Sequence, residues 1–378
     1  MNGPAPDNNT AASSRQLWTT LTDDVRIVVD DLQRRGVRRT VGGTFASLER
    51  FYVTEGDRKR LAELSEFRRW LRRFWWLVKG LLMKLTPARR VMLAAAFVLF
   101  IFGTGRFNTG RLRFEIRTAP LATTMVLVVL MLELKDKLVA RNELEAGRAV
   151  QLALMPAEKP NVPGWDVWLY TRPANDVGGD LVDHLKIDER QHFVALGDVS
   201  GKALPAALLS VKLQATLRAL APTFSDLGDL GAAVNRILQR DGLPSRFASL
   251  VYLLMSEDAG RIGVLNAGHM PPLLMRNGAV EILPRGGVVL GLIEDTTYVE
   301  QTIDLNAGDS LVVYSDGVSE AMNESEEFFD DERLVAVVRQ AAGLSAEATG
   351  RRVLDAVSAF VGEAAPSDDM SLIVVKRV

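Results

Sequence analysis

The spacing of hydrophobic and polar positions divides the chain into two parts. Beyond Pro156, short apolar or alternating runs separated by turn residues predict β-strands. The predicted strands cover residues 165–171, 181–187, 192–198, 247–255, 261–267, 272–276, 280–283, 298–305, 310–314 and 370–377. Helical periodicity appears at residues 205–221, 227–240, 331–341 and 346–360. Because the strands cluster and the helices come in pairs, this pattern favours an α+β fold of packed antiparallel sheets flanked by helices over a doubly wound parallel sheet.

The first half of the chain has a different pattern, in which basic and aromatic residues are interleaved. Between Arg58 and Arg90, arginines and lysines alternate with tryptophan, phenylalanine and leucine. This composition is typical of an amphipathic helix that lies in a membrane interface, with its basic side chains at the phospholipid headgroups. The alternative is a core helix of a small N-terminal domain.

Two uncharged apolar runs follow, at residues 91–103 and 119–132. Each is shorter than the ~20 residues that span a bilayer, although flanking basic residues could extend them by snorkelling. Their spacing predicts a helical hairpin and favours membrane association through transmembrane helices. The arginines between the runs conflict with the positive-inside rule, so surface-lying segments and buried core helices remain alternatives.

A continuous helix is predicted directly after the second run, over residues 133–151, because the segment is rich in helix-forming residues and contains no proline. Leu134, Leu138, Leu144 and Val150 could form a stripe that pairs with a second copy, although the stretch is too short to establish a coiled coil. We interpret the segment as a signalling linker helix that supports a homodimer. The alternative is a solvated linker.

Composition narrows the functional classes. The chain contains no cysteine, so disulfides, thiolate metal sites and cysteine-based phosphatase chemistry are excluded. A formal net charge of −2 and a pI near 6.1 give no basic signature of nucleic-acid binding. Residues 1–14 are small and polar, which predicts a disordered tail and not a signal peptide.

Four aspartates in four separate motifs are candidate metal ligands. Asp180 ends Val-Gly-Gly-Asp, Asp198 lies in Gly-Asp-Val-Ser-Gly, Asp316 lies in Ser-Asp-Gly, and Asp368 begins Asp-Asp-Met-Ser. Each sits where a strand-like run meets a turn, so a folded domain can bring them together. Carboxylates held close together repel unless a cation neutralises them, and sets of oxygen ligands suit Mg²⁺ or Mn²⁺. The pattern therefore indicates a two-metal phosphoryl-transfer site.

These motifs, in this order, resemble a SpoIIE/RsbU-type serine phosphatase domain, the bacterial branch of the metal-dependent type 2C (PPM) protein phosphatases. The similarity begins with Leu-Met-Pro at residues 154–156 and extends past the four aspartate motifs to the end of the chain. It includes Asn-Ala-Gly-His-Met-Pro-Pro at residues 266–272 and Tyr-Ser-Asp-Gly-Val-Ser-Glu-Ala at residues 314–321. A single Gly-Asp pair is commonly just a turn, but the ordered set over residues 146–378 is specific.

The resemblance implies an αββα sandwich that binds two Mn²⁺ or Mg²⁺ ions between its sheets at one edge. It also implies that Asp198 bridges both ions and that the backbone carbonyl of Val199 adds one oxygen. Asp316 and Asp368 would complete the ligand set, with Asp180 acting directly or through water.

The same resemblance implies a mechanism in which Asp198 and Asp316 are the central catalytic residues. A water molecule activated by the two ions would attack phosphorus in line, and no phosphoenzyme is expected. Ser200 is not a candidate nucleophile, because no histidine is arranged to activate it. Asp369 is interpreted only as the neighbour of Asp368.

Five further positions stand out. Among the histidines, His269 is the strongest functional candidate, although a role in ordering its loop is favoured, and His184 and His192 are predicted to lie on strand surfaces. Ala203 and Asp330 stand where relatives usually have glycine. Neither replacement affects a predicted ligand.

The sequence thus predicts a disordered tail at residues 1–14, a helical and membrane-associated region at 15–132, a linker helix at 133–155 and a phosphatase domain at 156–378. The expected protein is anchored at the inner membrane with its catalytic domain in the cytoplasm. Its expected substrate is a phosphorylated regulatory protein, such as an anti-sigma-factor antagonist in a partner-switching pathway. One alternative is a membrane-tethered pseudophosphatase that binds this partner without hydrolysis. Another is a transmembrane sensor whose C-terminal domain only mediates dimerisation.

Overall fold

The computed structural model describes residues 72, 75, 79–80, 82–102, 104–109, 112–241, 246–257 and 260–378. The predicted tail at residues 1–14 and most of the predicted interfacial helix between Arg58 and Arg90 lie outside these residues. The chain divides into two compact units, with the boundary between Lys135 and Asp136.

The first unit contains a helical hairpin. Helix α5 (Pro87–Ile101) and the start of helix α6 (Ala119–Leu154) are joined by the antiparallel strands β1 (Thr104–Thr109) and β2 (Leu112–Arg117). The two helices run antiparallel, because the Arg89 guanidinium pairs with the Glu133 carboxylate at 2.6 Å while the Thr118 hydroxyl donates to the Leu99 carbonyl at 2.7 Å. Both apolar runs are therefore helical, as the sequence predicts.

The prediction of transmembrane helices is wrong for this part of the chain. Helix α5 has 15 residues, which at 1.5 Å per residue span about 22 Å and fall short of a hydrocarbon core of about 30 Å. The apolar start of α6 gives way to charged residues from Glu133 onward. None of the helices in the described residues is long and apolar enough to cross a membrane.

Helix α6 continues without a break through the predicted linker at residues 133–151 and ends at Leu154. Its side chains Leu134, Leu138 and Val150, which belong to the predicted pairing stripe, are exposed.

The second unit contains two five-stranded sheets, in which every neighbouring pair of strands is antiparallel. The first sheet has the order β10-β7-β6-β5-β4, with bounds Gln301–Asp304, Arg261–Ala267, Ala248–Ser256, Gln191–Val199 and Leu181–Lys186. The second has the order β3-β12-β11-β8-β9, with bounds Trp165–Arg172, Met370–Arg377, Ser310–Tyr314, Leu273–Arg276 and Ala279–Ile282. The predicted strand at 298–305 is shorter in the structure than expected.

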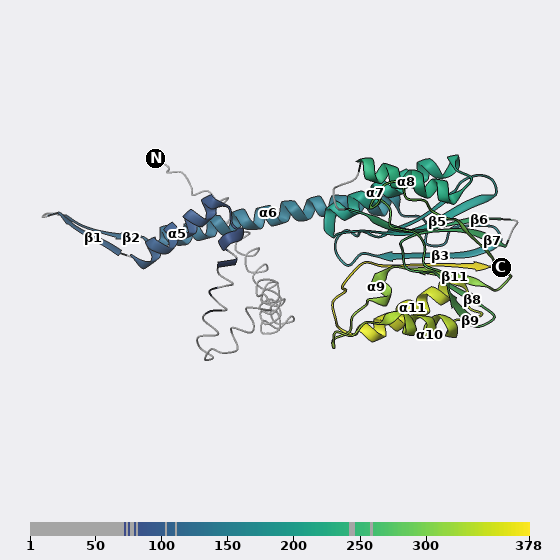
Figure 1. Ribbon diagram of the computed structural model, residues 1–378. Coiled ribbons are helices and arrows are strands. Elements are labelled where there is room, and N and C mark those ends of the chain that lie inside the picture. The colour runs from purple at the N-terminus through teal and green to yellow at the C-terminus, as the bar shows by residue number, and fades with distance from the viewer. Residues whose placement is uncertain are drawn as a thin grey trace, which may run out of the picture. The chain divides into compact units, whose positions relative to one another are not determined.

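Helices cover the outer face of each sheet (Figure 1). Helices α7 (Ala203–Leu220) and α8 (Leu227–Asp241), which the short 3-10 turn Ala221–Thr223 separates, pack on the first sheet. Helices α10 (Asp330–Gln340) and α11 (Ala346–Val361) pack on the second, beside the one-turn helix α9 (Asp316–Ser319). The result is the four-layered α+β sandwich that the sequence predicts.

Alternation along the strands produces three layers of core. In β5, Phe193 faces the helices and Val194 faces the other sheet, where it meets residues such as Ile373 of β12. Each fully buried side chain of this size contributes roughly 1.5–3 kcal/mol. This rigid sandwich fixes the ends of the strands, and the candidate site lies at those ends.

Candidate functional site

The four predicted aspartates come from both sheets and meet at one edge. Asp198 lies near the end of β5, and Asp180 directly precedes β4 on the neighbouring strand, since Leu181 pairs with Gly197. Asp316 begins α9 just after β11, and Asp368 lies just before β12. Strands β11 and β12 pair through Tyr314 and Leu372, so the second pair of aspartates is also side by side.

The carboxylates are close enough to change one another's protonation. Burial, followed by the negative charges of Asp316 and Asp368, raises the pKa of Asp198 to about 7. Burial and then the charge of Asp198 raise the pKa of Asp180 well above its usual value. The pKa of Asp316 is raised by burial and then by Asp368. Burial and like charge therefore oppose the charged forms of Asp180, Asp198 and Asp316, and a bound cation would offset this effect.

The donor set fits a hard divalent cation. All the candidate ligands are oxygens, and the chain offers no thiolate. The Val199 carbonyl faces the same space, because a side chain added at Gly179 would lie 3.0 Å from that oxygen and 3.5 Å from Asp198 Oδ1. Among the described residues, no three acidic or histidine side chains are close enough to form a closed metal site. The ligand atoms are therefore those that a divalent cation prefers, whereas the side chains lie farther apart than in a closed metal site.

Asp369 ties the glycine motif to the second sheet. Its carboxylate accepts hydrogen bonds from the backbone N–H of Ala174 at 2.7 Å and of Gly179 at 2.6 Å. A side chain at position 178 would collide with this carboxylate, since its Cβ would lie 2.6 Å from Oδ2, which explains the glycine there. Asp369 is thus an anchor of the site, a role that the sequence did not reveal.

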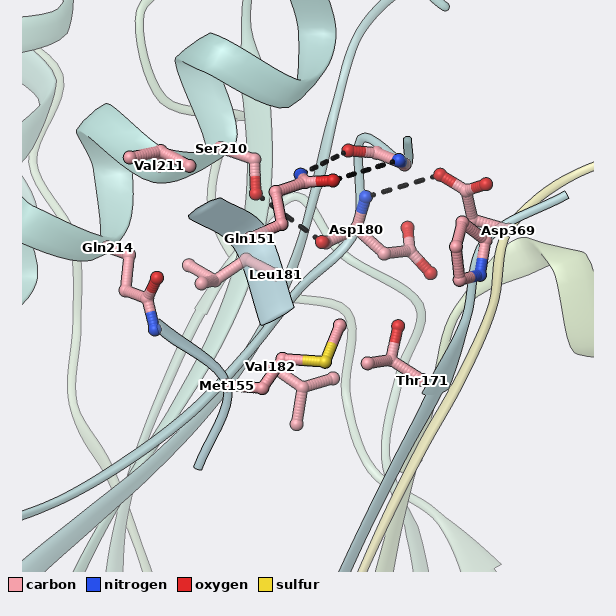
Figure 2. Close-up of a pocket in the computed structure, with 12 residues that line it drawn as sticks. Gln151, Met155, Thr171, Asp180, Leu181, Val182, Ser210, Val211, Gln214 and Asp369 are labelled. Carbon is pink, nitrogen blue, oxygen red and sulfur yellow. Dashed lines mark hydrogen bonds between the residues drawn. The ribbon is translucent and has the colours of Figure 1, made fainter. Parts of the chain in front are cut away.

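Asp180 is itself held between the sheets. Its carboxylate accepts a hydrogen bond of 2.5 Å from the hydroxyl of Ser371 in β12. Its backbone carbonyl accepts from Ser210 of α7 at 3.4 Å. Figure 2 shows Asp180 beside Asp369, with both side chains at the junction of the two sheets.

The end of helix α6 reaches the same loop. The Gln151 amide donates to the Gly178 carbonyl at 2.9 Å and accepts from the Gly178 N–H at 3.3 Å (Figure 2). Gln151, Asp180 and Asp369 line a small cavity of about 30 Å³ behind the loop. The linker helix is therefore bonded directly to the peptide two residues before Asp180.

Two other groups beside Asp198 and Asp368 have clear structural partners. The Lys202 ammonium lies 3.4 Å from Asp368 Oδ2, and both side chains are largely exposed. The Ser200 hydroxyl accepts a hydrogen bond from the Phe247 N–H at 2.9 Å, which fixes the turn after β5.

His269 joins the two sheets behind the aspartates. Its Nδ1 lies 2.7 Å from the Ser249 hydroxyl, and its Nε2 lies 3.1 Å from the Tyr314 carbonyl. Burial lowers the pKa of His269 to about 4, so the ring is neutral, with Nε2–H donating to Tyr314 and Nδ1 accepting from Ser249. Its backbone N–H donates to the Asn266 side chain at 2.9 Å. These contacts support the loop-ordering role.

The prediction of surface positions is wrong for His192, which is only 2% exposed. Its Nδ1 lies 3.1 Å from Nε2 of His184, and its Nε2 lies 3.3 Å from the Glu257 carboxylate. Both rings face the space between the sheets, at the end of β5 opposite Asp198. The alternating pattern of β5 contained this information, because His192 has the same parity as the buried Val194.

Ala203 and Asp330 stand where glycine is usual, and the structure explains that preference for glycine. Ala203 has a φ of 61° and Asp330 a φ of 63°, both in the left-handed region that glycine adopts without strain. Asp330 stabilises its own turn, because its carboxylate accepts from the Arg333 N–H at 2.9 Å and pairs with the Arg333 guanidinium at 2.6 Å. Ala203 has no side-chain group that could do the same.

Comparisons with known proteins agree with this geometry. The family profile described as Stage II sporulation protein E (SpoIIE) matches residues 188–378. Phosphoserine phosphatase RsbU of Bacillus subtilis is 26% identical over 239 residues, which cover 63% of this chain and 70% of RsbU. Protein IcfG of Synechocystis is 25% identical over 277 residues, covering 65% of this chain but only 43% of IcfG. The SiaA-PP2C domain of Pseudomonas aeruginosa superposes with a TM-score of 0.54 at 17% identity, over 64% of this chain and 98% of that domain.

Proposed function

We propose that this chain, which belongs to the SpoIIE family, is a metal-dependent protein serine/threonine phosphatase. The single observation that carries the proposal is the cluster of Asp180, Asp198, Asp316 and Asp368, drawn from both sheets to one edge. Burial and neighbouring negative charge raise the pKa of Asp180, Asp198 and Asp316 there. A structural role does not require such an arrangement, because repelling carboxylates destabilise the fold. Two bound divalent cations would offset that repulsion, so a metal site accounts for the arrangement.

Each residue of the cluster has a role in this function. Asp198, Asp316 and Asp368 hold two divalent cations, Mn²⁺ or Mg²⁺, and the Val199 carbonyl adds one oxygen. Asp180, oriented by Ser371, would hold a cation directly or through water. When bound, the cations neutralise the phosphoryl oxygens and lower the pKa of water at the site. Ser200 remains a turn residue, so the chain itself forms no phosphoenzyme.

The alternative is a scaffold that binds a phosphorylated partner without hydrolysing it. The intact carboxylate cluster favours the enzyme over this pseudophosphatase. The two functions differ in one measurement, the release of inorganic phosphate from a phosphoserine protein by the full-length chain in Mn²⁺. We expect release that EDTA abolishes and that excess Mn²⁺ restores. Tight binding with no release in Mn²⁺ or Mg²⁺ would establish the scaffold instead.

The substrate proposed here is a regulatory protein phosphorylated on serine or threonine, of the anti-sigma-factor antagonist type. Its support is the similarity to RsbU and to RsbP of Bacillus subtilis, both named phosphoserine phosphatases. A panel of phosphorylated antagonist proteins from the source organism tests this point. One of them should be dephosphorylated much faster than phosphocasein, whereas equal rates for all would contradict a dedicated substrate.

We further propose that the first unit holds the protein at the inner membrane surface, with the second unit in the cytoplasm, and that α6 pairs two copies. The support is the exposure of apolar side chains on α5 and α6. Phe97, Phe100 and Phe102 at the end of α5 are all at least 66% exposed. Leu134 and Leu138 in α6 are each about half exposed. Fractionation tests the first point, because protein that stays soluble without salt or detergent contradicts it. Light scattering of the full-length chain tests the second.

A further inference from the structure

A second cavity adjoins the aspartate cluster on the side of the second sheet. It has a volume of about 220 Å³ and lies between the end of β3, helix α9, the end of α11 and the loop before β12. Asp368 and Gly317, which follows Asp316, belong to its wall. A molecule whose phosphate reaches the cluster therefore places its neighbouring atoms at the mouth of this cavity.

The wall of the cavity is mainly apolar. Ala321 and Met322, just after α9, and Val357 and Val361 of α11 line it, and an alanine-proline segment that includes Ala365 closes it. Val357 is fully buried, whereas Ala365 is exposed at the rim. An apolar side chain entering from solvent would lose its contact with water here, which is the main source of affinity in such pockets.

One cation lines the cavity, and it has no partner within the described part of the chain. Arg172, the last residue of β3, is exposed, and none of the described carboxylates or carbonyls pairs with its guanidinium. Two further cations among the described residues are engaged beside the cluster, since Arg246 donates to the Ser200 carbonyl at 2.6 Å and Lys202 lies 3.4 Å from Asp368. A planar guanidinium without a partner is suited to a carboxylate brought by a ligand.

We propose that this cavity is the specificity site of the phosphatase, where it binds an apolar side chain next to the phosphoserine while Arg172 pairs with an acidic side chain of the same peptide. The inference rests on the proposed function. An extended peptide advances about 3.3–3.6 Å per residue, so the residue beside the phosphoserine reaches the cavity while the phosphate stays at the aspartates. The occupant is thus a segment of the phosphoprotein substrate, with apolar and acidic residues flanking the phosphorylated serine.

The test uses the full-length protein with Mn²⁺ and a set of fluorescent phosphoserine peptides. The peptides carry leucine or glycine beside the phosphoserine and glutamate, glutamine or lysine at the next position. Both kcat/KM and the affinity measured by fluorescence anisotropy are recorded. We expect the leucine peptide to exceed the glycine peptide by roughly tenfold, as is common for filling an apolar pocket. Glutamate should be preferred over lysine at the acidic position.

Two variants connect these preferences to the cavity. Ala365→Trp should fill it from the rim and remove the preference for leucine, whereas Ala342→Trp, at an exposed alanine between α10 and α11, should keep that preference. Arg172→Glu should invert the preference from glutamate to lysine, whereas Arg339→Glu, at an exposed arginine of α10, should not. A reversed preference between glutamate and lysine cannot result from misfolding, because misfolding would weaken the binding of all the peptides alike.

The two measurements separate this inference from the proposed function. Selective binding without phosphate release would contradict the phosphatase and leave the specificity site standing. Phosphate release with equal kcat/KM and equal affinity for the leucine and glycine peptides would overturn the specificity site alone. A leucine preference that survives Ala365→Trp would place the apolar contact elsewhere and overturn it as well.

Discussion

The two sides of the aspartate cluster are held very differently. On one side, Asp369 and Asp180 are fixed by hydrogen bonds from the Gly179 N–H and the Ser371 hydroxyl, each of 2.5–2.6 Å. On the other side, Asp368 is exposed, and within the described part of the chain its carboxylate pairs only with the Asp369 N–H at 3.0 Å and the Lys202 ammonium at 3.4 Å. The protein alone therefore organises one half of the site, and we infer that cations organise the other.

This difference has a consequence for the energetics of the site. Groups that are hydrogen-bonded to backbone contribute to folding, whereas clustered carboxylates without partners oppose it. The fixed half should consequently affect stability when it is mutated, and the open half should affect turnover. Substitutions on the two sides test this contrast.

The largest effect is expected from the central ligands. Asp198→Asn and Asp316→Asn each remove a charge that the cations need, so turnover should fall by more than the roughly 100-fold that marks the upper end for residues outside the ligand set. The free energy of unfolding in metal-free buffer should not fall, because repulsion in the cluster is relieved. Phosphate release and urea unfolding measure the two quantities. Near-normal turnover in both variants would remove these residues from the site.

The next effect concerns the anchor on the fixed side. Asp369→Ala leaves the N–H groups of Ala174 and Gly179 without acceptors, and each unpaired buried group costs about 1–3 kcal/mol. We expect the free energy of unfolding to fall by roughly 2–4 kcal/mol in urea titrations. Asp369→Asn keeps one acceptor oxygen and should lose less. Asp368→Asn, one residue away on the open side, should stay within about 0.5 kcal/mol of wild type. Equal losses at both positions would contradict the contrast.

The sequence predicted the sandwich well, because its strands alternate between two buried faces and its turns interrupt them. The β1-β2 hairpin was missed even though residues 112–117 alternate apolar and charged side chains, since the neighbouring apolar runs favoured a membrane interpretation. Positions at the ends of predicted strands identified four aspartates as candidate ligands. They did not show which of the adjacent Asp368 and Asp369 anchors the backbone. That assignment depends on the conformation of the loop before β12, which brings the Asp369 carboxylate to the N–H groups of Ala174 and Gly179. Gln151 gave no signal, because a single glutamine on a polar helix belongs to no pattern.

A smaller effect is expected from this glutamine. Gln151→Ala removes both hydrogen bonds to Gly178 and frees the peptide that precedes Asp180, so the affinity for Mn²⁺ should weaken by about tenfold, as for other residues that orient ligands. Titration calorimetry with Mn²⁺ measures this directly. Arg148→Ala, at an exposed position of the same helix, is the matched control. If both variants bind Mn²⁺ as the wild type does, helix α6 does not support the fixed side of the site.

The smallest effect is expected beside the open side, at the start of α7. Ala203 has a φ of 61°, a conformation that costs a residue with a Cβ roughly 1–2 kcal/mol. Ala203→Gly should remove this strain, and after the greater flexibility of glycine in the unfolded chain is subtracted, about 0.5–1 kcal/mol of stabilisation should remain. Asp330→Gly relieves the same strain at a φ of 63° but loses the hydrogen bonds to Arg333, so it should bring no gain. Urea unfolding of the two variants distinguishes these cases. A larger gain at position 330 would show that backbone strain at the start of α7 is already compensated, and that the open side of the site is more firmly built than its few hydrogen bonds indicate.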